Sequence, residues 1–194
     1  MPMKNLIGAV LCGGKSIRMG TDKGLIPKHE ETWASMAINK LSHFEIPVVL
    51  SINDTQKEKY KAQFPNNHLI PDHNIQARGA LQGLLSIHLE YPDKDILLFA
   101  CDLQNMYSET IQNLLSIYIH EPNFDFYAYQ HKMAFEPFCA IYTAKGLRPI
   151  KDLVDVHALQ NFSFQHVLHA GKTKCIDIVD NSSFKNFNNA SDIE

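Results

Sequence analysis

The sequence has no excess of positive charge and no long hydrophobic run. Eighteen Lys and Arg residues stand against 21 Asp and Glu, and the formal net charge of −3 excludes a generally basic nucleic-acid binder. The longest apolar stretches, at 6–14 and 96–101, are far shorter than the roughly 20 residues of a membrane span. The first stretch is also too short for a signal peptide, so we expect a soluble, cytoplasmic protein with neither nucleic acid nor membrane among its partners.

Cysteine is scarce and scattered. The four cysteines form no C-x-x-C pair and lie in apolar segments. They are Cys12, Cys101, Cys139 and Cys175. We expect buried, reduced thiols. The closest histidine pair, His166 and His169, has no further metal ligands nearby in the sequence and is expected on a solvated helix face.

What the chain does contain is a regular alternation of strand and helix patterns. Hydrophobic residues make up 45% of the 194 residues, enough for a sizeable core, and we expect a single domain over 1–194. The apolar spacing predicts strands at 6–12, 46–52, 68–71 and 95–101, and helices at 33–44, 55–64, 79–90 and 108–120. This order predicts an α/β fold with a mostly parallel sheet and helices on both faces.

The pattern changes after residue 122. Segments 125–130 and 133–142 are rich in β-forming residues and are separated by two residues, which predicts a hairpin or a mixed edge of the sheet. The last two expected elements are a helix at 162–169 and a strand at 174–179.

Small and cationic residues gather directly after the first expected strand. Residues 11–24 read LCGGKSIRMGTDKG. Ligands of parallel sheets bind outside the carboxyl ends of the strands, where a glycine-rich backbone can offer N–H groups to phosphates. The glycine spacing fits neither a Walker loop nor a dinucleotide fingerprint. An ordinary glycine turn with solvated lysines remains the alternative for this segment alone.

An aspartate follows the buried strand at 95–101. Because parallel strands end at the same edge of a sheet, Asp102 is expected beside the glycine loop, where it can hold Mg²⁺ against a triphosphate. Taken alone, Asp102 is equally consistent with a turn cap. The glycine loop favours the metal role.

Two further strand ends carry polar residues. Arg78, one of only three arginines, and Gly79 precede a helix whose N-terminus favours an anion. Asn53 and Asp54 follow the second strand and have amide and carboxylate groups that can read a nucleobase edge. A turn role is the alternative for Asn53.

The first loop resembles the L-x-G-G-x-S-x-R-M-G-x-D-K signature of the molybdenum cofactor guanylyltransferases, which are nucleotidyltransferases with a three-layer, Rossmann-like GT-A fold. Related cytidylyl and sugar-nucleotide transferases usually begin with L-A-A-G, so the double glycine and the D-K-G sequence favour the guanylyl branch. Other segments are similar to family motifs along nearly the whole chain. They are 79–86 (G-P-L-A-G-[ML]-L-S), 100–102 (P-C-D), 136–142 (x-P-[LF]-x-A-[LI]-Y) and 184–188 (F-x-N-[IV]-N).

The resemblance implies transfer of GMP from GTP to the terminal phosphate of molybdopterin, with Mg²⁺ as cofactor and pyrophosphate as the second product. It also implies further protein partners from cofactor biosynthesis or among molybdoenzymes. Carried over by position, the expected catalytic residues are Arg18, Lys23 and Asp102, with Asp102 as the metal ligand. The expected nucleotide-binding residues are Leu11, Cys12, Gly13, Gly14, Lys23, Asn53, Asp72 and Asp102. The expected acceptor-side residues are Arg78, Gly79, Asn186 and Asn188.

Three positions depart from the family pattern. Cys12 stands where Ala is usual, Ala80 replaces Pro, and residues 103–106 lack the proline that normally follows the metal aspartate. The missing proline is expected to loosen the loop that places Asp102. Two alternatives stay open: a nucleotidyltransferase of the same fold that uses CTP or a sugar phosphate, and a nucleotide-binding module without activity.

Overall fold

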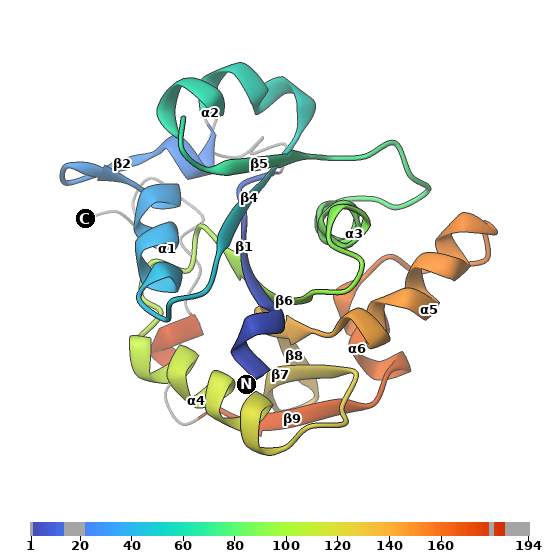
Figure 1. The fold of residues 1–194 in the computed structure, drawn as a ribbon. Coiled ribbons are helices and arrows are strands. Elements are labelled where there is room, and N and C mark those ends of the chain that lie inside the picture. The colour runs from blue at the N-terminus through green and yellow to red at the C-terminus, as the bar shows by residue number, and fades with distance from the viewer. Residues whose placement is uncertain (1, 14–21, 179–180, 185–194) are drawn as a thin grey trace.

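A seven-stranded sheet forms the centre of the computed structural model, which describes residues 2–13, 22–178 and 181–184 (Figure 1). Its strands are β1 (Leu6–Leu11), β4 (Val48–Ile52), β5 (His68–Pro71), β6 (Asp95–Ala100), β7 (Phe126–His131), β8 (Ala134–Tyr142) and β9 (Thr173–Asp177). The strand order is β5-β4-β1-β6-β8-β7-β9. The pairings are parallel from β5 to β6 and between β7 and β9, and antiparallel on both sides of β8.

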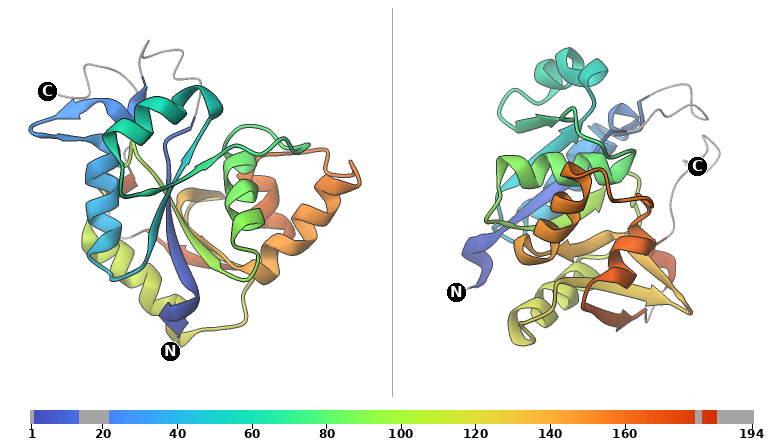
Figure 2. Two further views of the ribbon diagram at one scale, coloured as in Figure 1. Left: turned by 45° about the horizontal axis from the view of Figure 1, so that its top comes forward. Right: turned by 90° about the vertical axis from the view of Figure 1, so that its right-hand side faces the viewer.

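Helices cover both faces of this sheet. They are α1 (Trp33–Ser42), α2 (Lys57–Gln63), α3 (Ala80–Glu90), α4 (Ser108–His120), α5 (Ala144–Asp155) and α6 (Phe164–Ala170). Buried residues of α1, α2 and α4 pack on one face, and those of α3, α5 and α6 pack on the other. The left view of Figure 2 separates the two layers, with the blue and yellow-green helices on one side of the sheet and the green and orange ones on the other. The predicted three-layer α/β class is therefore confirmed.

The apolar run at the start of the chain explains why β1 lies in the middle. Leu6 and Val10 enter the core under α1 and α4, whereas Ile7, Ala9 and Leu11 enter the core under α3. A strand that is apolar on both faces is stable only where helices cover both sides.

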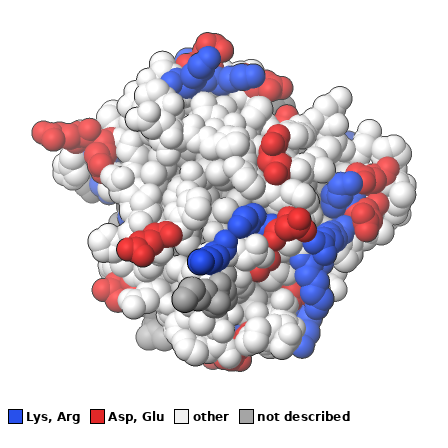
Figure 3. Space-filling model, in the orientation of Figure 1, with Lys and Arg blue, Asp and Glu red and all other residues white. Residues whose placement is uncertain are grey.

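Short elements complete the fold. Four 3₁₀ helices lie in the described part of the chain: η1 (Pro2–Asn5), η2 (Lys23–Leu25), η3 (Asp54–Gln56) and η4 (Asn181–Phe184). No helix within the described ranges is long and apolar enough to cross a membrane. On the face drawn in Figure 3, side chains of both charges are interspersed.

One helix and one two-stranded hairpin have no counterpart in the sequence predictions. The helix α5 begins at a cap, where Thr143 Oγ1 accepts a hydrogen bond from Gly146 N (3.0 Å). Pro149 lies inside it and removes a backbone donor, which disguises the helical pattern. The hairpin of β2 (Pro27–Lys28) and β3 (Glu31–Thr32) is too short to show an alternation.

The cysteine prediction holds for three of four positions. Cys12, Cys101 and Cys139 are buried, but Cys175 is exposed, which corrects the expectation. Cys175 lies in β9, the edge strand of the sheet, in which only Ile176 is buried. All four are free thiols. His166 and His169 are exposed on α6, as predicted.

Candidate active site

Lys23 and Asp102 form an ion pair although 79 positions separate them in sequence. Lys23 Nζ lies 2.9 Å from Asp102 Oδ2, and the two side chains are 22% and 18% exposed. The sheet topology brings the two segments to the same edge of the sheet. The strands β1 and β6 are parallel neighbours in which Leu11 pairs with Ala100, so the loops that follow them begin side by side.

The loop that carries Asp102 is held by side chains rather than by a proline. Lys40 Nζ, from α1, donates to the carbonyl oxygens of Gln104 (2.7 Å) and Met106 (3.0 Å). Gln104 Nε2 donates to the carbonyl of Cys101 (2.6 Å). Burial, reinforced by the nearby charge of Lys28, lowers the pKa of the Lys40 ammonium. These three hydrogen bonds hold the loop that follows Asp102, where the family pattern has a proline.

The first loop leaves β1 against the end of β4. Cys12 N and Gly13 N both donate to the carbonyl of Ser51, at 2.9 and 3.2 Å. Leu11 and Cys12 are 7% and 3% exposed, so their side chains are buried in the protein. A Cβ added at Gly13 would lie 3.7 Å from Asn53 N, which places the glycine directly beside the end of β4.

Asn53 is the N-terminal cap residue of the 3₁₀ helix η3. Its Oδ1 accepts a hydrogen bond from Thr55 Oγ1 (2.6 Å), and its backbone N–H donates to Gln56 Oε1 (2.8 Å). The turn role that the sequence left open is therefore present. Reading of a nucleobase by Asn53 stays a prediction.

Asp72 lies at the end of β5, one strand further along. Its N–H donates to the carbonyl of Ile52 (2.9 Å), which fixes it beside the end of β4. Burial, with the nearby Asp54 carboxylate, raises the pKa of Asp72, and His73 opposes that shift. Gly83 of α3 packs closely here, because a Cβ on it would lie 2.6 Å from Ser51 Oγ and 3.5 Å from Asp72 Oδ1.

The predicted acceptor-side residues are only partly placed. Arg78 is exposed, and Gly79 precedes α3 with a φ of 62°, a conformation that L side chains rarely adopt. Nothing lies within 4 Å of a Cβ added at Gly79, so the backbone there is open to approach. Four predicted site residues lie outside the described residues: Gly14, Arg18, Asn186 and Asn188.

Sequence reasoning assigned no role to several polar residues that shape this edge of the sheet. Asp22, Gln56 and Tyr60 form a hydrogen-bonded group beside Lys23. The position of Asp22 in the D-K-G sequence was the available signal for this group. Lys40 has no such signal, because its partners are backbone carbonyls of a distant loop.

The side chains present fit a magnesium ion that one carboxylate and the phosphates of a substrate would hold together. In the described ranges no group of three or more His, Cys, Asp or Glu side chains could enclose a metal. Mg²⁺ binds through one or two carboxylates plus substrate phosphates, and Asp102 supplies one carboxylate beside the cationic Lys23.

Comparisons with known proteins agree on the fold. A family model described as the MobA-like NTP transferase domain matches residues 8–170. The structure is similar to molybdopterin-guanine dinucleotide biosynthesis protein A from Archaeoglobus fulgidus, at a TM-score of 0.77 and 18% identity, covering 96% of this chain and 94% of that one.

Two other solved structures have the same fold. The bifunctional IspDF from Campylobacter jejuni matches at a TM-score of 0.73 and 13% identity, covering 97% of this chain and 53% of that one. A cytidylyltransferase from Leptospira borgpetersenii matches at 0.66 and 12%, covering 90% and 76%. At such identities the likeness establishes a shared architecture.

Proposed function

Because the chain belongs to the MobA-like NTP transferase domain family, we propose that it transfers GMP from GTP to molybdopterin and releases pyrophosphate. Nucleotidyl transfer follows from the family. Two observations support the guanylyl and pterin specificity: the double glycine and D-K-G sequence of the first loop, and the similarity to the Archaeoglobus fulgidus protein. The ion pair between Lys23 and Asp102 is the observation that carries the proposal, since a cation beside a carboxylate is what a triphosphate with Mg²⁺ requires.

The proposal assigns the site residues to different parts of the substrate. Residues 11–14 would wrap the GTP, with Lys23 and Arg18 as cations at its phosphates. Asn53 and Asp72, at the ends of β4 and β5, would hold the nucleoside. Arg78, Gly79, Asn186 and Asn188 would face molybdopterin, and the proteins that supply or receive the cofactor are the further expected partners.

The chemistry needs no protein nucleophile. A terminal phosphate oxygen of the acceptor attacks the α-phosphorus of GTP, the new P–O bond forms, and the bond to pyrophosphate breaks. Mg²⁺ held by Asp102 would neutralise charge on the phosphate oxygens. Lys23 donates to Asp102, and its ammonium would stabilise negative charge on the triphosphate at this edge.

Calorimetric titration with GTP, CTP, UTP and ATP, each with Mg²⁺ and with EDTA, tests the proposal. We expect selective binding of GTP that depends on Mg²⁺. A preference for CTP would move the protein to the cytidylyl branch. Failure of every triphosphate to bind would favour a module without activity.

A further inference from the structure

Asp22 uses both of its carboxylate oxygens inside the protein. Oδ1 accepts hydrogen bonds from Gly24 N (3.1 Å) and Tyr60 Oη (2.9 Å), and Oδ2 accepts one from Gln56 Nε2 (2.6 Å). A carboxylate held by three internal donors is fixed in place. Asp22 caps the 3₁₀ helix that begins at Lys23, so its position sets the direction in which Lys23 leaves the backbone.

Gln56 connects the three segments that meet at this point. Its Nε2 donates to the carbonyl of Cys12 (3.0 Å) as well as to Asp22, and its Oε1 accepts from Asn53 N (2.8 Å). The side chain is buried, with 6% of the residue exposed. One amide therefore ties the end of β1, the end of β4 and the Lys23 segment together, and only an amide supplies both the donors and the acceptor.

Tyr60 reaches Asp22 through space that a glycine leaves open. The tyrosine is fully buried in α2, and a Cβ added at Gly24 would lie 2.1 Å from its Oη. Burial, followed by the proximity of Cys12 and Asp22, raises the pKa of Tyr60, so the hydroxyl stays protonated and donates. The glycine of the D-K-G sequence is thereby explained by contact with Tyr60.

We propose that Gln56 and Tyr60 are positioning residues for nucleotidyl transfer, which hold Asp22 and through it keep Lys23 at Asp102. This inference rests on the proposed function. Because Gln56 also binds the backbone of Asn53, the same group links the nucleoside end of the site to its phosphate end. Neither residue needs to touch substrate for this role.

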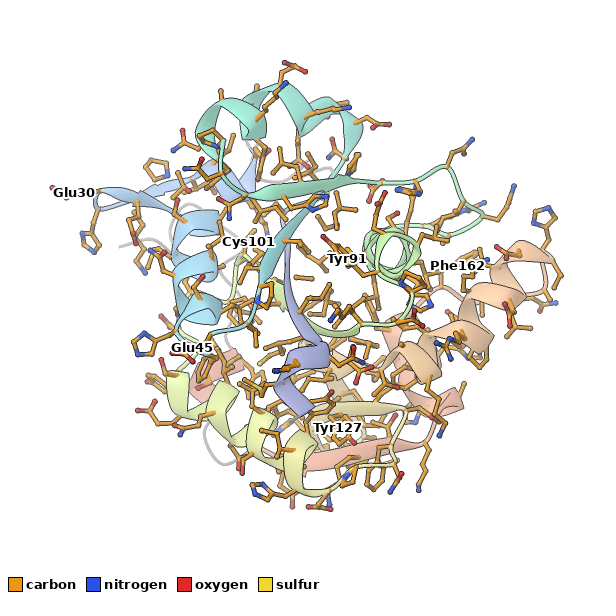
Figure 4. The ribbon with its side chains drawn as sticks, viewed as in Figure 1. Glu30, Glu45, Tyr91, Cys101, Tyr127 and Phe162 are labelled. Carbon is orange, nitrogen blue, oxygen red and sulfur yellow. The ribbon has the colours of Figure 1, made fainter. Side chains whose placement is uncertain are left out.

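The first test is Tyr60→Phe, which keeps the buried ring and removes one hydrogen bond to Asp22. We expect kcat to fall about tenfold while KM for GTP changes little, as for one lost hydrogen bond to a charged acceptor. The control is Tyr127→Phe. Tyr127 is equally buried, its hydroxyl donates to the carbonyl of Glu121 (3.0 Å), and it lies well away from Cys101 at the end of β6 (Figure 4). The control should keep the wild-type kcat.

The second test is Gln56→Glu, which replaces a donor with a carboxylate facing Asp22 and the Cys12 carbonyl. We expect a larger loss of kcat than in Tyr60→Phe, because two donated bonds become repulsive contacts. Gln165→Glu is the matched control. The Gln165 amide also bonds twice to backbone, at Phe135 N (2.9 Å) and Phe135 O (2.7 Å), but in α6 on the other side of the sheet.

A readout that needs no turnover separates this inference from the proposed function. Acetylation of Lys23 by an amine-reactive reagent, followed by mass spectrometry, should increase in Tyr60→Phe and Gln56→Glu relative to both controls. If the wild type transferred no nucleotide, the proposed function would fail while the labelling result still decided the positioning role. Folded variants with wild-type kcat, or a lower kcat with unchanged Lys23 labelling, would overturn the inference.

Discussion

The parallel part of the sheet, from β5 to β6, and the mixed part, from β8 to β9, are built in different ways. The segments that follow the strands of the parallel part carry polar side chains that bond to one another at a single edge. The mixed part is held by aromatic packing, in which Tyr142 lies 5.4 Å from both Phe126 and Phe164, ring centre to ring centre. We therefore expect substitutions in the parallel part to change the rate of nucleotidyl transfer, and those in the mixed part to change the free energy of unfolding.

The largest effect is expected from Lys23→Met, which keeps the aliphatic stem and removes the ammonium. We expect kcat to fall by roughly 10²–10³-fold, as when one preorganised donor to developing charge is lost. The pair is partly exposed, so the free energy of unfolding should change by about 1 kcal/mol or less. Steady-state kinetics and urea unfolding check both values. A fall in the free energy of unfolding well beyond this value would contradict the expectation that substitutions in the parallel part mainly change the chemistry.

Gly171→Ala tests the mixed part. A Cβ at this position would lie 2.4 Å from Cε2 of Phe126, which is only 1% exposed and cannot move aside. We expect a destabilisation of about 1–3 kcal/mol from overpacking. The affinity for GTP, measured by calorimetry on the folded variant, should stay at the wild-type value. Weaker GTP binding by the folded variant would contradict the expectation that substitutions in the mixed part change only stability.

Lys40→Met removes both hydrogen bonds to the loop of Asp102. We expect kcat to fall about tenfold and the Mg²⁺ concentration at half-maximal rate to rise, since two bonds from a charged donor hold this loop. Lys40→Arg should recover part of the rate. An unchanged magnesium dependence would mean that Asp102 is held without Lys40.

The smallest effect concerns His88, which lies on α3 between the two parts. Burial, followed by the charges of Arg148 and Lys151 on α5, lowers the pKa of His88 in the folded state. The unfolded state therefore binds a proton more readily, so stability is full above the ordinary histidine pKa and falls as the pH drops below it. Unfolding free energies measured between pH 7 and pH 5 should show a weaker pH dependence in His88→Gln. Identical slopes would show that His88 makes no contribution.

The sequence predicted the parallel part well because its signals are local. Apolar runs that end in glycine, asparagine or aspartate mark both the strands and the edge where ligands of parallel sheets generally bind, and parallel pairing then brings Asp102 to the side of the first loop. The helix α5 was not predicted, because Pro149 interrupts its helical pattern. The hydrogen bonds of Gln56, Tyr60 and Lys40 were not predicted for another reason. They depend on which distant groups the packing brings near these side chains, and residue type alone does not encode that.

The central claim is that Lys23 and Asp102 form the reaction centre. Pyrophosphate release from GTP, in the presence of molybdopterin and Mg²⁺, tests it most directly when wild type is compared with Asp102→Asn. We predict release by the wild type and a loss of roughly a hundredfold or more in the variant, with the fold retained. Release at the wild-type rate by folded Asp102→Asn would contradict the claim.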